Sequence, residues 1–282
     1  MVLRGEADPH QVGAFLMLLR FRGEDPPEIG GMVEAARESL ARPWPVQFAD
    51  LDWPSYGAGR TRGAPWFLLS ALALARAGVT VLMHGSNEYS AGISVESGLR
   101  ALGPALTDRF TYSPLAALSP SLDDLLRMRR LFGLRSPVNT VARLLNPADA
   151  AAGVDGVFHP PYIAVHLGVA ELLGRERLFV LKGGGGEAER VPLKPATGWL
   201  WDRRSGKAEI PLSARADLVA TASGTDTLEL FAAVWRGEAA PPTAVATVMA
   251  TIGLALLALG WADTAEAAER DAERIWRDRR PG

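Results

Sequence analysis

The chain has 282 residues, of which 48% are hydrophobic and 22% are charged, which is ordinary for a globular protein with a substantial core. The formal net charge of −2 gives no overall attraction to nucleic acid or anionic membranes, so any affinity for phosphate must come from a local patch. Because the chain has no cysteine, disulfides, zinc–thiolate sites and thiol nucleophiles are excluded.

The first fifty residues are expected to form a helical unit. Asp8 and Asp25 are each followed by proline, the pattern of an N-cap with proline at the first helical position. Apolar residues recur at helical spacing in 12–19 and 29–40. Pro43 and Pro45 then end the unit.

From Asp50 onward the pattern changes to alternating strands and helices. We predict strands at 79–83 and 178–181, and helices at 71–77, 94–102 and 121–132, the last with Ser121 as its cap. This alternation favours a mainly parallel sheet and an α/β fold. Residues 244–262 carry no charge and could span a bilayer by length alone, but they contain much alanine, and we interpret them as a buried helix.

Four segments carry a family resemblance: 13–25, 78–85, 132–139 and 144–147. They resemble the anthranilate phosphoribosyltransferases, and the spacing agrees over nearly the whole chain. The sequence is therefore similar to glycosyl transferase family 3, the phosphoribosyltransferase and nucleoside phosphorylase group, and within it to a divergent anthranilate phosphoribosyltransferase-like branch.

The resemblance implies a small N-terminal helical domain and a larger α/β domain with a mainly parallel central sheet and a hinge cleft between them. We place the helical domain at residues 1–48, joined by helices around 115–145, and the α/β domain at 49–114 and 146–282. The resemblance also implies a homodimer formed through the helical domain. The family pattern has one more helix before Leu3, which we expect to be missing here.

The family's phosphate loop, Gly-Thr-Gly-Gly-Asp, corresponds to residues 57–61 of this chain. Gly57 and Gly59 preserve the tight turn, whose amides we expect to bind phosphate. Arg60 replaces a glycine, and it either fills part of the pyrophosphate space or offers a fork of donors to a phosphate. The alternative is a plain turn in which Arg60 and Arg62 are solvated.

The family's Lys-His-Gly-Asn-Arg segment corresponds to Met83, His84, Gly85, Ser86 and Asn87, of which the last four are predicted ligand-binding residues. The lysine that would neutralise phosphate is thus a methionine. His84 either donates a hydrogen bond into the cleft or is satisfied by backbone. The hydroxyl-bearing helix start of the family is replaced by an apolar one, at residues 65–70.

Lys182, a predicted ligand-binding residue, and the glycine run after it occupy the position of a family turn that ends in an Asp-Glu pair, which holds magnesium. Here the pair reads Ala188 and Glu189, so Glu189 is the one candidate metal ligand, with Glu187 as a substitute. No cofactor is assigned, and Mg²⁺ is expected only if the protein is catalytic. The alternative for the glycine run is a flexible loop.

Arg135 matches the family arginine that meets the aromatic acid, and Asn139 matches a nearby cleft asparagine. Arg129, Arg130 and Arg143 would line the same side of the hinge, although adjacent helical residues point in different directions, so only part of this set can converge. The alternative is a solvated basic face. The turn that contains His159 is interpreted as a structural strand-to-helix connection rather than a metal site.

Two functions follow from these residues. The first is a family member with a degraded site for phosphoribosyl pyrophosphate and magnesium, which lacks anthranilate phosphoribosyltransferase activity and binds a phosphate-bearing small molecule or nucleic acid. The second is an active glycosyl or phosphoribosyl transferase with an altered substrate. The N-terminus has no apolar signal core, and we expect a cytoplasmic protein without membrane partners.

Overall fold

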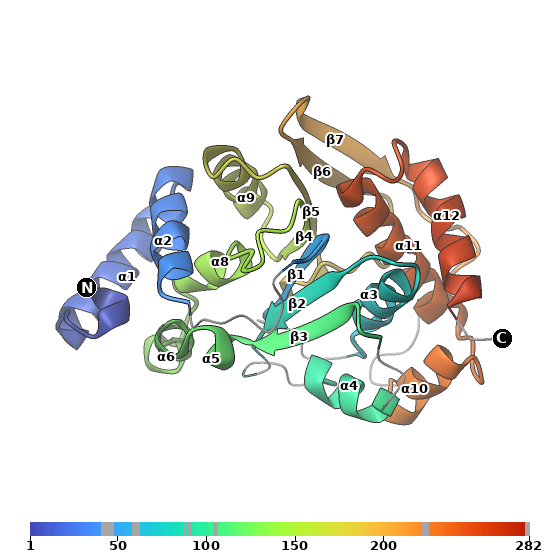
Figure 1. Ribbon diagram of the computed structural model, residues 1–282, viewed down its shortest axis with the longest axis horizontal. Helices are drawn as coiled ribbons and strands as arrows, with labels where there is room; N and C mark the ends of the chain where they lie inside the picture. The colour runs from blue at the N-terminus through green and yellow to red at the C-terminus, as the bar shows by residue number, and fades with distance from the viewer. Residues whose placement is uncertain are drawn as a thin grey trace.

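One sheet organises the chain in the computed structural model, which describes residues 1–40, 48–57, 63–86, 88, 92–103, 107–220 and 226–279 (Figure 1). Within these residues it has seven strands in the order β3-β2-β1-β4-β5-β6-β7. They are β1 (Leu51–Ser55), β2 (Val81–Gly85), β3 (Phe110–Pro114), β4 (Ala152–Val157), β5 (Arg177–Lys182), β6 (Ala196–Asp202) and β7 (Gly206–Leu212).

The strands β1 to β5 are parallel, and β6 and β7 extend the sheet as an antiparallel hairpin. The predicted α/β fold with a mainly parallel sheet is therefore confirmed. Because β1 and β4 are neighbours and the chain winds outward from them in opposite directions, their carboxyl ends form a topological switch point. Open parallel sheets bind ligands at such a point.

A group of helices and short turns lies on one side of the sheet, and its two N-terminal helices lie outside the others, away from the strands (Figure 1). These are α1 (Pro9–Arg22), α2 (Pro26–Glu38), α5 (Leu115–Leu118), α6 (Pro120–Arg127), α7 (Arg129–Phe132), α8 (Val138–Arg143) and α9 (Pro161–Leu172), with the short 3-10 turns Val2–Arg4 and Gly184–Gly186. The predicted caps are present, since Asp8 accepts hydrogen bonds from the first turn of α1 and Asp25 forms a capping box with Glu28. The predicted domain boundaries stay a prediction.

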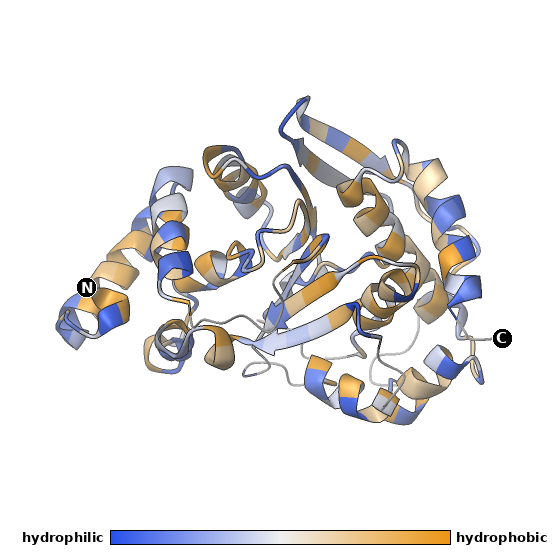
Figure 2. Cartoon of the chain, viewed as in Figure 1, coloured by the Kyte–Doolittle hydropathy of each residue, from blue (hydrophilic) through white to orange (hydrophobic). Residues whose placement is uncertain are grey.

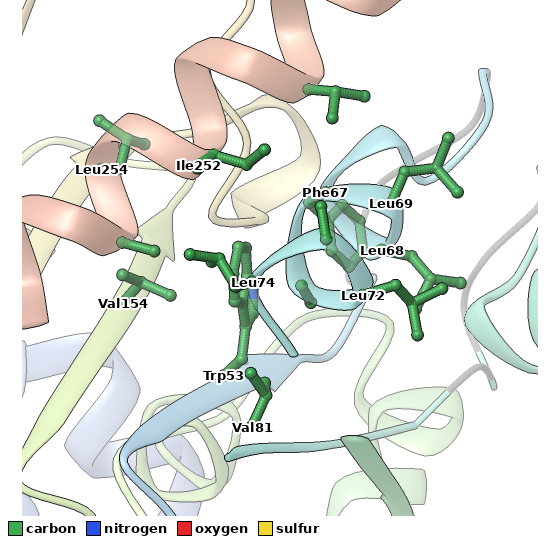
Figure 3. Packing of buried hydrophobic residues seen from close by; sticks show 14 of the residues in the cluster. Trp53, Phe67, Leu68, Leu69, Leu72, Leu74, Val81, Val154, Ile252 and Leu254 are labelled. Carbon is green, nitrogen blue, oxygen red and sulfur yellow. The ribbon is translucent and has the colours of Figure 1, made fainter. Parts of the chain in front are cut away.

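The other face is covered by α3 (Trp66–Arg76), α11 (Pro242–Leu259) and α12 (Ala265–Asp278), with α4 (Val95–Leu102) and α10 (Leu228–Arg236) at one end. Figure 3 shows Trp53 and Val154 from the sheet, Phe67 from α3 and Ile252 from α11 packed into this core. The helix α11 is long and apolar enough to cross a membrane, but 72% of it is buried inside the molecule, as the sequence predicted. Figure 2 shows its hydrophobic colour beside the mixed colour of α12.

Three predicted boundaries were wrong. The helix predicted at 121–132 is divided into α6 and α7, and its cap is Ser119 rather than Ser121, because Pro120 fits the first helical position and Ser119 accepts from the Leu122 amide. The strand predicted at 79–83 runs from Val81 to Gly85, where it pairs with both neighbours. The helix predicted at 71–77 already begins at Trp66.

Replacing Ile252 with alanine tests the packing between α11 and the sheet. Ile252 is completely buried, so the substitution removes apolar contacts and leaves a cavity. We expect it to lower the free energy of unfolding by about 2–5 kcal/mol, measured by urea denaturation. The control Val219→Ala, at an exposed position, should change it by less than about 0.5 kcal/mol. Equal effects of the two substitutions would contradict this packing.

Candidate anion-binding site

The backbone amide of Gly57, at the start of the predicted phosphate loop, is already occupied. Its N–H donates to Oε1 of Glu187, which lies on the far side of the switch point after β5. Glu187 is 1% exposed, and its Oε2 has no hydrogen-bond partner among the described residues. A side chain of the protein itself thus links the segment after β1 to the segment after β5, across the carboxyl end of β4.

Two glycines permit this bridge. A Cβ on Gly156, in β4, would lie 2.1 Å from the Glu187 carbonyl carbon and oxygen, and a Cβ on Gly183 would lie 1.7 Å from that oxygen. Any side chain at these positions would push the Glu187 segment off the sheet edge. The glycine run after Lys182 forms a short 3-10 turn, Gly184–Gly186, which leads directly into the Glu187 segment.

Two further carboxylates accept backbone amides at the other end of the loop. Oε2 of Glu189 accepts from the Phe67 amide at 2.9 Å, in the first turn of α3, and Oδ2 of Asp226 accepts from the Ala64 amide at 2.8 Å. A helix N-terminus is where a phosphate would be expected to bind. Protein carboxylates therefore stand at both described ends of the segment 58–62, and Gly59 and Arg60 lie outside the described residues.

These carboxylates do not fit a magnesium ion. Mg²⁺ takes one or two carboxylates together with substrate phosphates and water. Glu187 and Glu189 instead each accept a backbone N–H. In the described part of the chain, no group of three or more histidine and acidic residues is placed to hold a metal ion. The role of Glu189 as a ligand stays a prediction.

His84 belongs to a buried polar network behind the sheet edge. The Tyr56 hydroxyl lies 2.8 Å from its Nδ1, and Oδ1 of Asp52 lies 3.2 Å from its Nε2. Nη2 of Arg175 donates to the other oxygen of Asp52 at 2.7 Å. His84 therefore contacts side chains rather than backbone: Nδ1 is hydrogen-bonded to Tyr56, and Nε2 faces Asp52 at ion-pair distance without a hydrogen bond among the described residues.

The charges in this network are mutually compensating. Burial raises the pKa of Asp52, but the nearby His84 and Arg175 outweigh burial and hold that pKa below its ordinary value. Burial raises the pKa of the Tyr56 hydroxyl well above its ordinary value, so this hydroxyl stays neutral. The charged groups of this network therefore face one another in the interior, and the role of the network is structural.

The predicted residues after His84 close the strand end. A Cβ on Gly85 would lie 1.8 Å from the Ser55 carbonyl oxygen, so only glycine fits there, and the Ser86 amide donates to that same oxygen at 3.2 Å. Asn87 lies outside the described residues. Lys182 is exposed at the end of β5, and it does not line the cavity described next.

Arginine side chains line a cavity of about 290 Å³ between the helical elements and the end of β4. Arg20 comes from α1, Arg129 and Arg135 come from α7 and the turn after it, and Arg143 is the last residue of α8. The remaining polar side chains of its lining are those of Ser136, Asn139, Thr140, His159, Tyr162 and His166. Of the predicted site residues, Arg135 and Asn139 are therefore brought together.

The four arginines raise the positive potential of this cavity. Burial, and then the charges of Arg129, Arg143 and Arg20, lower the pKa of Arg135 to about 10. Burial and the neighbouring like charges both disfavour the charged guanidinium, and a bound anion would offset both effects. The Arg135 guanidinium also lies 5.4 Å from the centre of the Phe158 ring, which fixes its direction.

Tyr162 orients the rim of the cavity. Arg20 donates to its hydroxyl at 2.6 Å, and that hydroxyl donates to Glu24 at 2.8 Å. Burial and the bond to Glu24 raise the pKa of Tyr162 to about 12, so it stays protonated at physiological pH. Below it, Nδ1 of the buried His166 lies 2.7 Å from Oδ2 of Asp155.

The sequence anticipated only part of this cavity. Arg129 faces it while Arg130 forms an ion pair with Glu88, which confirms that adjacent arginines diverge. The turn with His159 connects β4 to α9 as predicted, but it also lines the cavity. Arg20 was missed, because nothing in its helical spacing signals that α1 reaches the end of a strand more than 130 residues later.

Comparisons with known proteins show which family this chain belongs to. Residues 1–40 match the helical bundle domain of the glycosyl transferase family. An anthranilate phosphoribosyltransferase of Anaeromyxobacter sp. (strain Fw109-5) is 32% identical over 241 residues, which cover 73% of this chain and 69% of that protein. The chain belongs to glycosyl transferase family 3, as an anthranilate phosphoribosyltransferase-like member.

Other members of the family agree with this assignment. The anthranilate phosphoribosyltransferase of Brucella suis biovar 1 is 31% identical over 206 residues, which are 66% of this chain but only 58% of that protein. An uncharacterized protein of Aquifex aeolicus is 32% identical and is covered over 62% of its length. The matched segments thus span about six tenths of the length of these two relatives.

Solved structures of the family share the fold. The crystal structure of anthranilate phosphoribosyltransferase from Thermus thermophilus has a TM-score of 0.76 and 25% identity, covering 99% of this chain and 88% of that one. The enzyme from Saccharomyces cerevisiae in complex with PRPP and Mg has a TM-score of 0.71 over 99% of this chain and 86% of its own, and at 14% identity it supports the fold alone.

Replacing Asp52 with asparagine tests the buried network. Arg175 would lose its buried carboxylate, so we expect the free energy of unfolding to fall by about 3–5 kcal/mol. Because the folded-state pKa of Asp52 is lowered, this loss should be complete above the unfolded-state value of about 3.9. It should shrink as the pH falls through the lower folded-state value. Denaturant unfolding at several pH values, with the exposed Asp263→Asn as control, measures it; a loss that grows toward acid pH would contradict it.

Proposed function

We propose that this protein is a glycosyl transferase family 3 member that binds a small phosphate-bearing or carboxylate-bearing ligand in the arginine cavity and does not carry out anthranilate phosphoribosyl transfer. The observation that supports this proposal most directly is the occupation of the Gly57 amide by Glu187. A pyrophosphate group would compete there with a carboxylate that is covalently part of the protein and already in place.

The chemistry of phosphoribosyl transfer explains why this matters. The departing pyrophosphate needs amide donors, a cation and a metal ion to carry its charge. Here the amides of Gly57, Ala64 and Phe67 face carboxylates, and the family lysine is Met83, which is completely buried. Losing a single such donor commonly costs about 2.7–4 kcal/mol of transition-state stabilisation. No magnesium-dependent step is proposed.

The arginine cavity supports binding of an anion elsewhere. It gathers Arg20, Arg129, Arg135 and Arg143, and its direct lining contains no acidic side chain among the described residues. Guanidinium groups bind carboxylates and phosphates through paired hydrogen bonds. The cavity therefore favours a small anion over a nucleic acid as the ligand.

Nucleic acid binding is the less favoured form of the proposal. It would need a continuous stripe of uncompensated arginines and lysines. In the described residues, three basic side chains that could contribute to such a stripe form ion pairs instead: Arg130 with Glu88, Arg203 with Glu176 and Lys207 with Glu171. Binding of single- or double-stranded DNA that weakens steeply with salt would reverse this preference.

The alternative, an active transferase with a changed acceptor, is supported by the 32% identity to an anthranilate phosphoribosyltransferase. In that case a bound substrate would have to displace Glu187 and Glu189 from the amides, and those carboxylates would then be free for Mg²⁺. Calorimetry with phosphoribosyl pyrophosphate, with and without Mg²⁺, separates the two functions, because only the alternative requires tight, metal-dependent binding.

The turnover experiment uses the full chain with phosphoribosyl pyrophosphate, Mg²⁺ and anthranilate, with the Thermus thermophilus enzyme as the positive control. We expect no loss of anthranilate fluorescence above the uncatalysed rate, because the leaving pyrophosphate is not stabilised. Turnover at about 1 s⁻¹ or faster, as in ordinary enzymes, would contradict the proposal.

We also propose a homodimer formed through α1. This helix exposes Phe15, Leu18 and Phe21, the last at 91%, and an apolar groove of about 750 Å³ lies beside it, between α1 and α2. Exposed apolar patches of this kind mark protein–protein interfaces. The match of residues 1–40 to the family's helical bundle agrees with such a role.

Light scattering after size exclusion tests the dimer. A chain of 30.1 kDa should elute at about twice that mass. The double substitution Leu18→Glu and Phe21→Glu should give the monomer mass, because charges would be buried at the interface. The control Val219→Glu, at an exposed position away from α1, should leave the mass unchanged. A wild-type monomer at tens of micromolar would disprove this assembly.

A further inference from the structure

Arg143 occupies the closed end of the arginine cavity. It is the last residue of α8 and is 6% exposed, whereas Arg20, Arg129 and Arg135 are only partly buried. Its guanidinium lies 5.9 Å from the centre of the Tyr56 ring. Beside it, Gly186 has a φ of +81°, and a Cβ there would approach Nη2 of Arg143 to 3.2 Å. The glycine turn therefore leaves room for the guanidinium group.

The guanidinium of Arg143 forms no ion pair with any acidic side chain in the described part of the chain. Neither Nη1 nor Nη2 makes a hydrogen bond there. Glu187 is adjacent in sequence to Gly186, yet it accepts from Gly57 instead. Buried charges in folded proteins are normally paired, since desolvation of a lone ion is costly. The nearby Arg135 has its pKa lowered to about 10 by burial and then by the charges of Arg129, Arg143 and Arg20.

Polar side chains connect the closed end to the rim. Asn139 and Arg143 are four residues apart on α8, so they share one face of the helix. Asn139 donates to the Ser136 carbonyl, and its Oδ1 is buried without a partner among the described residues. The cavity volume of about 290 Å³ is at the small end of the range for ligand sites, which suits a compact molecule.

We infer that the cavity binds a small ligand with two anionic groups, one held by Arg143 at the closed end and the other held by Arg20 and Arg135 at the rim. This inference rests on the proposed function, because it takes the cavity to be an anion site. It adds the substrate class, a compact dianion that carries a carboxylate and a phosphate or two carboxylates. A ligand with one anionic group at the rim would leave Arg143 uncompensated.

Calorimetry with three probes tests the inference: benzoate, phenyl phosphate and 4-carboxyphenyl phosphate. The third probe carries both anionic groups and should bind at least about tenfold tighter than either of the others, since each charge-assisted pair contributes on this scale. This comparison uses the wild-type protein alone, so it does not depend on the folding of any variant.

Two substitutions then test whether Arg143 binds the second anionic group of the probe. Arg143→Met should abolish the advantage of 4-carboxyphenyl phosphate and leave the binding of phenyl phosphate within about twofold. Arg130→Met, which removes an exposed arginine outside the cavity, should leave all three affinities unchanged. Ligand-free Arg143→Met should unfold at the same temperature as the wild type or higher, because the substitution removes a buried charge without a partner.

The outcomes separate this inference from the proposed function. If the doubly charged probe binds no tighter than phenyl phosphate, or keeps its advantage in Arg143→Met, the inference is wrong and the cavity remains a site for one anion. If no probe binds at millimolar concentration, both are wrong. If anthranilate is turned over while the advantage depends on Arg143, the proposed loss of activity is wrong and the inference stands.

Discussion

The hydrogen bond from the Gly57 amide to the Glu187 carboxylate is the contact on which the rest of the site depends. It joins the segment after β1 to the segment after β5 at the switch-point edge of the sheet, and it exists only because Gly156 and Gly183 let the Glu187 backbone cross this edge in close contact. Once this carboxylate is in place, the position where a phosphate would meet the loop carries a negative charge of the protein. The same substitution of carboxylate for phosphate recurs at the Phe67 amide, where Glu189 caps the start of α3.

The positive charge lies a short way along the same edge of the sheet. The arginine cavity is lined at one side by Gly156 and Val157, at the end of β4, and at the other by residues of α1 and α8. Carboxylates thus surround the ends of the loop, whereas arginines line the cavity. Gly186, which lies beside Arg143, and the buried Glu187 lie between these two regions of opposite charge. The fold shared with phosphoribosyl transferases can therefore bind an anion without catalysing the release of pyrophosphate.

The sequence predicted the fold well, because helix caps at Asp8 and Asp25 and the alternation of apolar strands and helices are local signals. It also selected Arg135 and Asn139, which the structure brings into one cavity, through the family resemblance. It could not find the partner of Gly57, since a contact between residues 130 positions apart leaves no mark in spacing. For the same reason the inward-facing network of His84 and the contribution of Arg20 to the cavity became visible only in three dimensions.

The protein's own carboxylates hold the amides that flank the loop. A titration of the labelled chain with magnesium pyrophosphate, followed in the ¹H–¹⁵N spectrum with the amides of Gly57, Ala64 and Phe67 assigned, tests this arrangement. We expect these three amide resonances to stay in place, because Glu187, Asp226 and Glu189 keep their hydrogen bonds to them. Saturable shifts of these amides would show instead that the loop still binds the leaving group and that the carboxylates do not block it.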